Sequence, residues 1–244
     1  MLNPGVLPHD RWYGRLARLP LRLIPKSAVL PILQGPMRGY RWTVGALTHG
    51  CWIGDYELVR QRSFLRLVKP GATVYDLGAN CGYYTLLSAH LVGPQGRVVA
   101  VEPLRRNLLL LRRHLVLNDL VERVTVVERA VADVEGALRF HEEPNAAQSA
   151  LRPDGELEVR ATTIDAMVLR DGLPPPDVIK SDIEGAEGRM LLGAEAVIRR
   201  YHPAFILATH GPAAREECHE ILRGHGYRIE PESQHPDDNI AVYE

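Results

Sequence analysis

Cysteine is scarce in this 244-residue sequence, and the cysteines that it has lie far apart. They are Cys51, Cys81 and Cys218, and no two of them form a CxxC pair. This spacing argues against a zinc site and a disulfide framework, and it is typical of a reducing compartment. Bilayer-spanning apolar runs and a basic-then-apolar leader are also missing. We therefore expect a cytoplasmic protein.

The sequence also has almost no net charge. Lys and Arg total 29 and Asp and Glu total 30, which gives a formal net charge of -1. Proteins that bind nucleic acid usually have a basic surplus, so we expect no nucleic-acid partner. The length fits one α/β domain with a small N-terminal addition.

Two common nucleotide-binding motifs are absent. The sequence contains neither the G-x-G-x-x-G fingerprint of nicotinamide and flavin enzymes nor a GK[ST] phosphate loop. A nicotinamide dehydrogenase is therefore a weak alternative.

A different glycine-containing turn is present at Val74–Tyr84. An apolar strand there contains a carboxylate, Asp76, and is followed by Gly78, Gly82 and a helical stretch. Such a turn surrounds a small ligand with backbone amides. Asp76 would repel a diphosphate and attract a cationic or hydroxyl-bearing ligand, which favours S-adenosylmethionine.

Prolines set the N-terminal segment apart from the rest of the chain. Six prolines divide residues 1–39 into pieces too short for long helices, and basic residues alternate there with leucines and Trp12. We predict an arm or lid over residues 1–39 that packs on the main domain, residues 40–244. Weak contact with a membrane surface is a second interpretation of the same residues.

Strands and helices alternate after residue 70, which predicts a Rossmann-like α/β fold. We expect a mainly parallel seven-stranded sheet, helices on both faces and an antiparallel C-terminal hairpin. Three further expectations are a hairpin of Tyr40–Val44 with Ala46–Cys51, a single helix over Ala186–Arg200 and extra strands at Leu138–Glu142 and Glu158–Thr162.

Polar residues gather where the predicted parallel strands end. Glu102 ends the second of these strands, Asp182 and Glu184 follow the fourth, and His210 follows the fifth. Ligands of open parallel sheets bind at this edge. Glu102 can accept hydrogen bonds from both hydroxyls of a ribose.

Three motifs in order resemble the FkbM-type branch of class I S-adenosylmethionine-dependent methyltransferases. Residues 76–85, DLGANCGYYT, are similar to motif I of class I enzymes. Residues 180–187, KSDIEGAE, and 50–57, GCWIGDYE, are similar to the branch's K-x-D-[IV]-E-G-x-E and G-x-W-x-G-x-Y-E segments. Residues 162–165, TTID, resemble its T-x-D stretch, and the resemblance extends from about Gly50 to the last residue.

The resemblance implies S-adenosylmethionine as the cofactor and assigns positions around it. Asp76, Gly78, Asn80 and Gly82 would frame the methionine and ribose, Glu102 the ribose, and Ala130 with Val131 the adenine. Asp182 would lie near the methionine amine or the transferred methyl, and Glu57 would close over the methionine end. The expected cofactor-binding residues are Glu57, Asp76, Gly78, Ala79, Asn80, Gly82, Tyr83, Glu102, Pro103, Ala130, Val131 and Asp182.

We expect methyl transfer to a hydroxyl of a small molecule, a sugar or a glycolipid. His210 is the first candidate for the base because histidine titrates near neutral pH, and Asp182 and Glu184 are rival bases. The same three residues could hold a divalent metal that orients a diol, but we expect no metal. Glu187 needs no role beyond its interaction with the helix dipole.

The sequence leaves other classes of function open. A non-catalytic S-adenosylmethionine-binding or scaffolding module is the main alternative. N-methylation of nucleic acid is disfavoured, because the fourth strand does not end in the Asn/Asp-Pro-Pro-aromatic turn. The oligomeric state is not indicated, and a homo-oligomer stays open.

Overall fold

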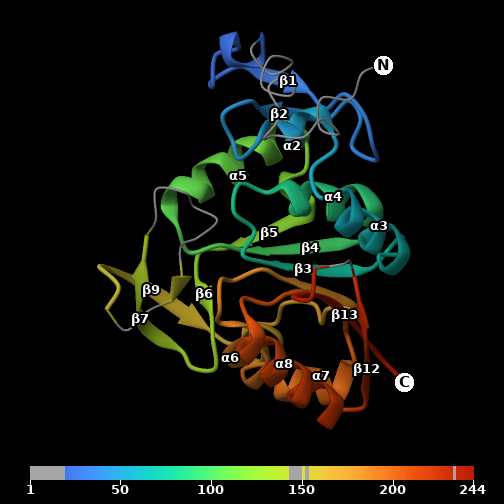
Figure 1. The fold of residues 1–244 in the computed structure, drawn as a ribbon, viewed down its shortest axis with the longest axis vertical. Coiled ribbons are helices and arrows are strands. Elements are labelled where there is room, and N and C mark those ends of the chain that lie inside the picture. The colour runs from blue at the N-terminus through green and yellow to red at the C-terminus, as the bar shows by residue number, and fades with distance from the viewer. Residues whose placement is uncertain (1–19, 143–149, 152–153, 233–234) are drawn as a thin grey trace.

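The main sheet has seven strands in the order β12-β13-β11-β10-β3-β4-β5 (Figure 1). The computed structural model describes residues 20–142, 150–151, 154–232 and 235–244 of the protein. The seven strands are β3 (Thr73–Leu77), β4 (Arg97–Val101), β5 (Val124–Val127), β10 (Val178–Ser181), β11 (Ala204–Ala208), β12 (Tyr227–Pro231) and β13 (Asp238–Tyr243). The strands from β5 to β11 are parallel, and β13 is antiparallel to both β11 and β12. The predicted sheet and its antiparallel C-terminal hairpin are confirmed.

Helices cover both faces of this sheet, as expected (Figure 1). Alternate strand residues point to opposite faces: Val74 packs with the helices on one side, whereas Tyr75 and Leu77 pack with those on the other. The first side carries α3 (Leu58–Leu67), α4 (Tyr83–Val92) and α5 (Arg105–Leu117), and the second carries α6 (Glu187–Leu192), α7 (Glu195–Tyr201) and α8 (Pro212–Gly224). Burial on both faces explains why the strands are continuously apolar.

The predicted hairpin near residue 45 is wrong. Strand β2 (Arg41–Thr43) pairs instead with β1 (Val29–Pro31), and residues His49–Ile53 form helix α2. Helical spacing buries Cys51, Trp52 and Ile53 together, and Gly54 ends α2 in a left-handed conformation with φ 92°. Three consecutive buried side chains are incompatible with a strand that has one face in solvent.

The N-terminal elements rest on the main domain. A short 3-10 helix at Pro20–Leu23 precedes β1, and Ile32 and Met37 are each 1% exposed in the same apolar cluster as α4 and α5. The arm's residues 1–19 lie outside the described part of the chain. The division of the chain at residue 39 stays a prediction.

A buried histidine joins the N-terminal hairpin to the loop after β3. The Thr43 amide donates to Nε2 of His114 at 3.1 Å, and Nδ1 of the same ring lies 2.7 Å from the Cys81 carbonyl. The ring must therefore be neutral with its proton on Nδ1. Trp42 stacks on it with a centroid separation of 4.0 Å. Burial lowers the pKa of His114 to about 4, although its bond to Cys81 opposes the shift.

The free energy of unfolding is expected to fall as pH decreases from 6.5 to 4. The folded pKa of His114 lies below its unfolded value, so its contribution is present above pH 6.5 and is lost toward pH 4. The full loss is on the order of 3 kcal/mol. Urea unfolding at several pH values would measure it. His114→Gln should reduce this slope, and an identical slope in both proteins would contradict the assignment.

The predicted single helix at Ala186–Arg200 is also wrong, because the chain breaks it into α6 and α7. A side chain at Gly193 would place Cβ 2.2 Å from the Ala132 carbonyl oxygen, so the helix ends against a neighbouring segment. Helix α7 then begins anew, and the Asp165 carboxylate accepts from the Ala196 and Val197 amides at 3.0 and 2.8 Å. Asp165 therefore caps a helix that is distant in sequence.

A second, smaller sheet lies beside the carboxyl edge of the main one. Its order is β6-β9-β7-β8, and its strands are β6 (Ala130–Val131), β7 (Gly136–His141), β8 (Ala150–Leu151) and β9 (Leu157–Thr162). The two extra strands expected from the sequence are β7 and β9, which pair antiparallel. Short helical turns at Val121–Arg123 and Ala166–Arg170 precede β5 and β10.

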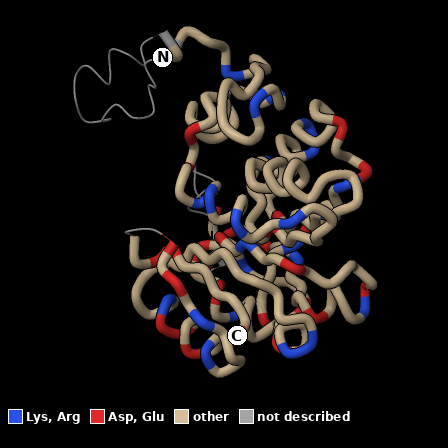
Figure 2. Tube along the Cα trace, turned by 90° about the vertical axis from the view of Figure 1, so that its right-hand side faces the viewer, with Lys and Arg blue, Asp and Glu red and all other residues tan. Residues whose placement is uncertain are grey.

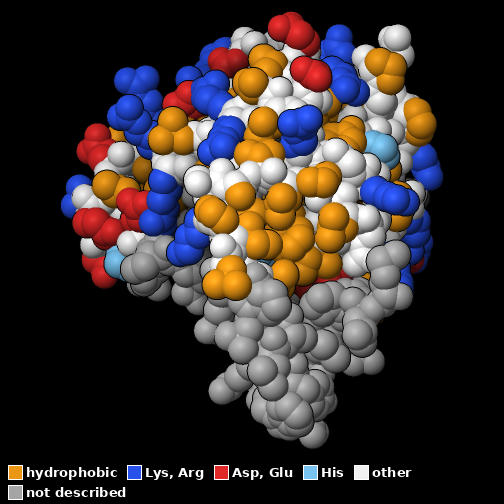
Figure 3. Space-filling model, turned by 90° about the horizontal axis from the view of Figure 1, so that it is seen from above, with side chains coloured by type: hydrophobic (Ala, Val, Ile, Leu, Met, Phe, Trp, Pro, Cys, Tyr) orange, Lys and Arg blue, Asp and Glu red, His pale blue; other side chains and the backbone are white. Residues whose placement is uncertain are grey.

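Charges of both signs are interspersed along the chain trace (Figure 2). Seen from above, hydrophobic side chains gather on one face of the molecule (Figure 3). The exposed large hydrophobic side chains of residues 20–40 are Leu23 and Leu33, which are 84% and 53% exposed. No helix in the described ranges has the length and apolar content to span a membrane.

Candidate active site

A cavity opens where the chain changes direction in the main sheet. After β3 the chain continues to β4 and β5 on one side, and it later returns to β10 on the other side of β3. The divergence of these loops leaves a crevice, and ligands of open α/β sheets bind there. The cavity and its open mouth together enclose about 870 Å³ of space not filled by protein atoms.

Most of the predicted cofactor-binding residues line this cavity. They are Gly78, Ala79, Asn80, Tyr83, Glu102, Pro103, Ala130, Val131 and Asp182, and the predicted base Glu184 lies among them. Four predicted site residues do not line it, namely Glu57, Asp76, Gly82 and His210. Glu57, Asp76 and Gly82 are expected cofactor-binding residues and His210 is the expected base, and these roles stay predictions.

Glu102 organises the loop after β3. Its Oε2 accepts the Asn80 amide at 2.8 Å, and its Oε1 accepts the Leu104 amide at 2.9 Å and the Asn107 side chain at 3.1 Å. Only 4% of Glu102 is exposed, and burial raises the pKa of its carboxyl group against the effect of these donors. Carboxylate oxygens retain free lone pairs after such bonds, so Glu102 can also accept from a ligand hydroxyl.

Gly78 permits a close approach between two strand ends. It has φ 70°, and a Cβ there would lie 2.0 Å from the Asp182 carbonyl oxygen. Any other residue would push the loops after β3 and β10 apart. Both loops line the cavity, so this glycine determines how closely its two walls meet.

Asp76 lies beneath the cavity and is not part of its lining. It is completely buried, its Oδ1 is 3.1 Å from Lys180 Nζ, and its Oδ2 accepts from Thr85 Oγ1 at 2.6 Å. Lys180 Nζ also donates to the Gly78 carbonyl at 3.0 Å. Asp76 therefore acts on the loop through Lys180. The sequence contained Lys180 within KSDIEGAE but gave no indication of this role.

Arg60 in α3 is a second residue that sequence reasoning missed. Arg60 is only 8% exposed. It pairs with Glu57 at 3.2 Å, Asp182 at 3.4 Å, Glu232 at 3.3 Å and Asp238 at 2.6 Å. Four carboxylates around one arginine leave a negative surplus beside the cavity. Arg60 thus holds Glu57 outside the cavity lining, and it also orients the Asp182 carboxylate.

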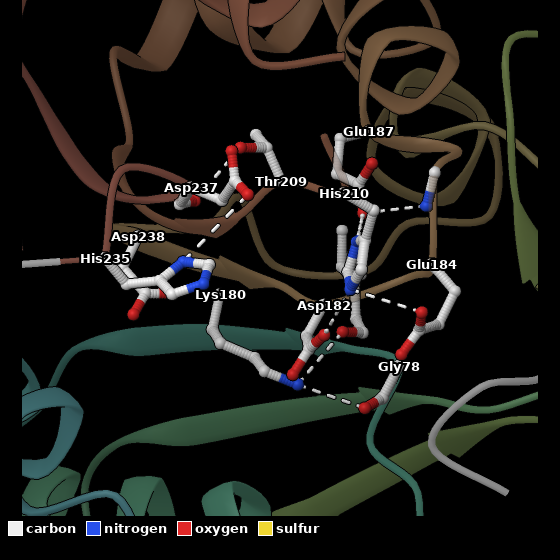
Figure 4. Close-up of polar contacts among 12 residues, drawn as sticks. Gly78, Lys180, Asp182, Glu184, Glu187, Thr209, His210, His235, Asp237 and Asp238 are labelled. Carbon is white, nitrogen blue, oxygen red and sulfur yellow. Dashed lines mark hydrogen bonds and ion pairs between the residues drawn. The ribbon is translucent and has the colours of Figure 1, made fainter. Parts of the chain in front are cut away.

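His210 follows β11 and is enclosed by carboxylates (Figure 4). Its Nδ1 is 2.8 Å from Glu187 Oε1, and its Nε2 is 3.2 Å from Glu184 Oε2 and 3.7 Å from Asp182 Oδ1. Partial burial opposes a charge on the ring, but Glu184 and Glu187 outweigh it and raise the pKa of His210 to about 10. The ring is therefore an imidazolium at neutral pH. The sequence did not predict the contact with Glu187.

The residues weighed as metal ligands are also close together. Within the described part of the chain, Asp182, Glu184 and His210 offer donor atoms that lie within 4.8 Å of one another. In this arrangement the His210 ring contacts both carboxylates through Nε2. Independence from metal stays a prediction.

Comparison with known proteins identifies the family. The family profile described as "Methyltransferase FkbM domain" matches residues 76–229, which is more than half of the chain. The chain belongs to the FkbM methyltransferase family. The expected resemblance is thereby confirmed.

One relative is similar in sequence, and two solved structures are similar in fold. The chain is 27% identical over 211 residues to the 31-O-demethyl-FK506 methyltransferase FkbM of Streptomyces tacrolimicus, covering 71% of this chain and 80% of the relative. A crystal structure of methyltransferase FkbM from Methylobacillus flagellatus has a TM-score of 0.54 and 20% identity over 75% of this chain, which spans half the length of that protein. A SAM-dependent O-methyltransferase from Thermotoga maritima has a TM-score of 0.51 and 16% identity, covering 89% and 78% of the two chains.

The cofactor of this FkbM-family chain is S-adenosylmethionine, as expected. The cavity suits such a ligand chemically, since Glu102 and Asp182 place carboxylates on its walls and Gly78 keeps one wall free of a side chain. A ribose needs acceptors, and a sulfonium and an ammonium need negative surroundings. The hydrogen-bond acceptors and the negative charge of the cavity thus fit the cofactor.

Proposed function

We propose that the chain transfers a methyl group to a hydroxyl oxygen of a small molecule, a sugar or a glycolipid. The observation that carries this proposal is the cluster of His210, Asp182 and Glu184 at the edge of the cofactor cavity. These groups can orient a hydroxyl or accept its proton. The name of the Streptomyces relative, a 31-O-demethyl-FK506 methyltransferase, supports an oxygen acceptor.

The roles of the cofactor-binding residues follow from their positions. Glu102 would accept from the ribose hydroxyls, Ala130 and Val131 would border the adenine, and Asp182 would face the ammonium or the methyl group. The other contacts would come from Gly78, Ala79, Asn80, Tyr83 and Pro103. Asp76, Gly82 and Glu57 would act indirectly, through Lys180, the start of α4 and Arg60 respectively.

The chemistry of the proposed reaction needs alignment and a proton acceptor. S-adenosylmethionine, when bound, supplies a methyl group on a positively charged sulfur. The cavity walls would hold the acceptor oxygen in line with that methyl, and positioning of this kind is a major source of rate enhancement. His210 would accept the hydroxyl proton at Nε2 once the acceptor replaces a carboxylate there. Asp182 and Glu184 would hold the hydroxyl.

His210→Ala is expected to lower kcat by about 100- to 10,000-fold, the usual contribution of a general base. It should preserve the increase in melting temperature caused by S-adenosylmethionine, because His210 does not line the cavity. Turnover would be measured as S-adenosylhomocysteine formed with a panel of macrolides, sugars and glycolipids. Differential scanning fluorimetry would measure the shift.

A matched control is His225→Ala, since His225 follows α8 at the opposite edge of the sheet, just before β12 begins. It should leave both measurements unchanged, and EDTA should leave turnover unchanged.

Wild-type kcat/KM should rise with pH toward about 10, where the His210 ring becomes neutral. Unchanged turnover in His210→Ala would remove His210 as the base.

The non-catalytic alternative has its own outcome in the same experiment. A clear thermal shift with S-adenosylmethionine, without methyl transfer to the panel or to a cell extract, would favour a binding or scaffolding module. The absence of a shift with either S-adenosylmethionine or S-adenosylhomocysteine would contradict the cofactor site. Nucleic acid stays outside the proposal, because the chain has no basic surplus.

A further inference from the structure

The carboxylates around His210 are not equivalent. The Glu187 side chain is 0% exposed, whereas those of Glu184 and Asp182 are 25% and 30% exposed. Glu187 contacts one ring nitrogen, Nδ1, and the two exposed carboxylates lie at the other, Nε2. Figure 4 shows Glu187 on one side of the imidazole and Glu184 and Asp182 on the other. The ring therefore has a buried side, at Nδ1, and a more exposed side, at Nε2.

Glu187 is held firmly on the buried side. It lies in the first turn of α6, and its Oε1 accepts the Gly185 amide at 3.1 Å in addition to contacting His210. Helix α8 packs closely against α6: a Cβ on Gly188 would lie 2.5 Å from the Glu217 carboxylate. The other oxygen of Glu187, Oε2, has no hydrogen-bond partner among the described residues. His210 is thus the one cationic partner recorded for this buried carboxylate there.

The opposite side of the ring is easier to open. Glu184 has a left-handed backbone conformation with φ 53°, which is uncommon for a residue other than glycine, and its side chain lines the cavity. Its contact with Nε2 is 0.4 Å longer than that of Glu187 with Nδ1, from 3.2 and 2.8 Å. A hydroxyl entering from the cavity would displace Glu184 rather than Glu187.

We propose that Glu187 is the positioning residue for His210, fixing its ring through Nδ1 so that Nε2 is the atom that receives the acceptor proton. This inference rests on the proposed function. A buried carboxylate on one imidazole nitrogen orients the ring, fixes its tautomer and stabilises the imidazolium that forms. Glu187 itself touches no reacting atom.

The reacting form of His210 is the neutral ring, which becomes the main form as the pH rises toward about 10 and Nε2 releases its proton to solvent. The O–H bond of the acceptor breaks and its proton moves to Nε2, while the new C–O bond forms as the methyl–sulfur bond breaks. The sulfur becomes neutral, and one positive charge appears on His210 beside Glu187. The positive charge is therefore transferred from the cavity to a site that already has a buried counter-ion.

The groups that affect this titration come from several elements. Asp182, Glu184 and Glu187 face the ring directly. Arg60 in α3 pairs with Asp182, and Cys218 and Glu217 in α8 lie against the Glu187 side of α6. Substitution at Glu187 alters the ring without removing a residue that lines the cavity.

Two variants separate charge from orientation. Glu187→Gln retains an oxygen for the Gly185 amide and Nδ1 but removes the charge. It should shift the acidic limb of the kcat/KM profile at least one pH unit lower, with plateau kcat within about tenfold. Glu187→Leu removes the acceptor, so plateau kcat should fall about 100-fold while the KM for the acceptor changes less than threefold. Glu217→Gln, a neighbouring exposed acid, should change neither quantity.

Nitrogen NMR of the histidine rings gives a readout that is independent of turnover. The spectra are recorded on the full chain with S-adenosylhomocysteine at a pH above 10, where the ring is neutral. Nδ1 of His210 should then carry the proton in wild type and Glu187→Gln. In Glu187→Leu the proton should be shared between Nδ1 and Nε2, because the two tautomers mix. If Glu187→Leu does not fold, the Glu187→Gln pH shift and ring pKa still decide the matter.

The outcomes distinguish this inference from the proposed function. A slow His210→Ala enzyme together with an unmoved pH limb in Glu187→Gln, or an unreduced plateau in Glu187→Leu, would overturn the role of Glu187 alone. A His210→Ala enzyme with wild-type turnover would overturn the base itself. A loss of stability without any change in pH limb or tautomer would make Glu187 a purely structural residue.

Discussion

Glu102→Ala is expected to weaken S-adenosylmethionine binding by about 100-fold or more. The variant loses the proposed acceptor for the ribose, and a hydrogen bond to a charged group contributes roughly 1.5–3 kcal/mol. It also releases the Asn80 and Leu104 amides and the Asn107 side chain, so the loop that forms the cavity wall loses its anchor. A factor of 100 corresponds to about 2.7 kcal/mol.

Isothermal titration calorimetry with S-adenosylmethionine and S-adenosylhomocysteine would measure this loss. Glu122→Ala is a matched control, because Glu122 is an exposed acid in the turn before β5. A dissociation constant for Glu102→Ala within threefold of wild type would place the ribose elsewhere. Circular dichroism would establish that the variant is folded.

Lys180→Met is expected to destabilise the protein by roughly 3–5 kcal/mol, the usual effect of removing one partner from a buried ion pair. The substitution leaves Asp76 completely buried with Thr85 as its remaining side-chain donor. It also removes the donor to the Leu77 and Gly78 carbonyls. Cofactor affinity should therefore decrease together with stability.

The double variant Asp76→Asn/Lys180→Met should recover much of the lost stability, because no uncompensated charge stays buried. Urea unfolding would measure the free energy of unfolding of each protein. Arg199→Ala breaks an exposed i,i+4 pair with Glu195 and should cost about 0.5 kcal/mol or less. A Lys180→Met protein as stable as that control would show that the buried pair contributes little.

The sequence predicted the main sheet well because its strands are short apolar runs bounded by glycine, proline and charge. The failures have tertiary causes. Nothing local marks the break at Gly193, since the Ala132 carbonyl that requires it lies about sixty residues earlier in the sequence. The pairing of β1 with β2 was missed because β1 lies in a proline-rich stretch that suggested irregular structure.

The candidate site was predictable where a residue ends a strand and unpredictable where two side chains meet. Glu102 and Asp182 follow strands, and the geometry of a parallel sheet brings such positions to one edge. The contact of His210 with Glu187 depends on how α6 packs beneath the end of β11. The sequence likewise could not reveal that Lys180 pairs with the Asp76 carboxylate.

The arginine of α3 has a consequence for the order in which the molecule can be completed. Arg60 takes two of its four carboxylates, Glu232 and Asp238, from the region of the last two strands. Strand β13 also inserts between β11 and β12, which both precede it in the sequence. During synthesis the ribosome must therefore pass Asp238 before Arg60 can pair with all four of its carboxylates. A nascent chain halted earlier would contain every cofactor motif and still be unable to form the complete set of ion pairs around Arg60.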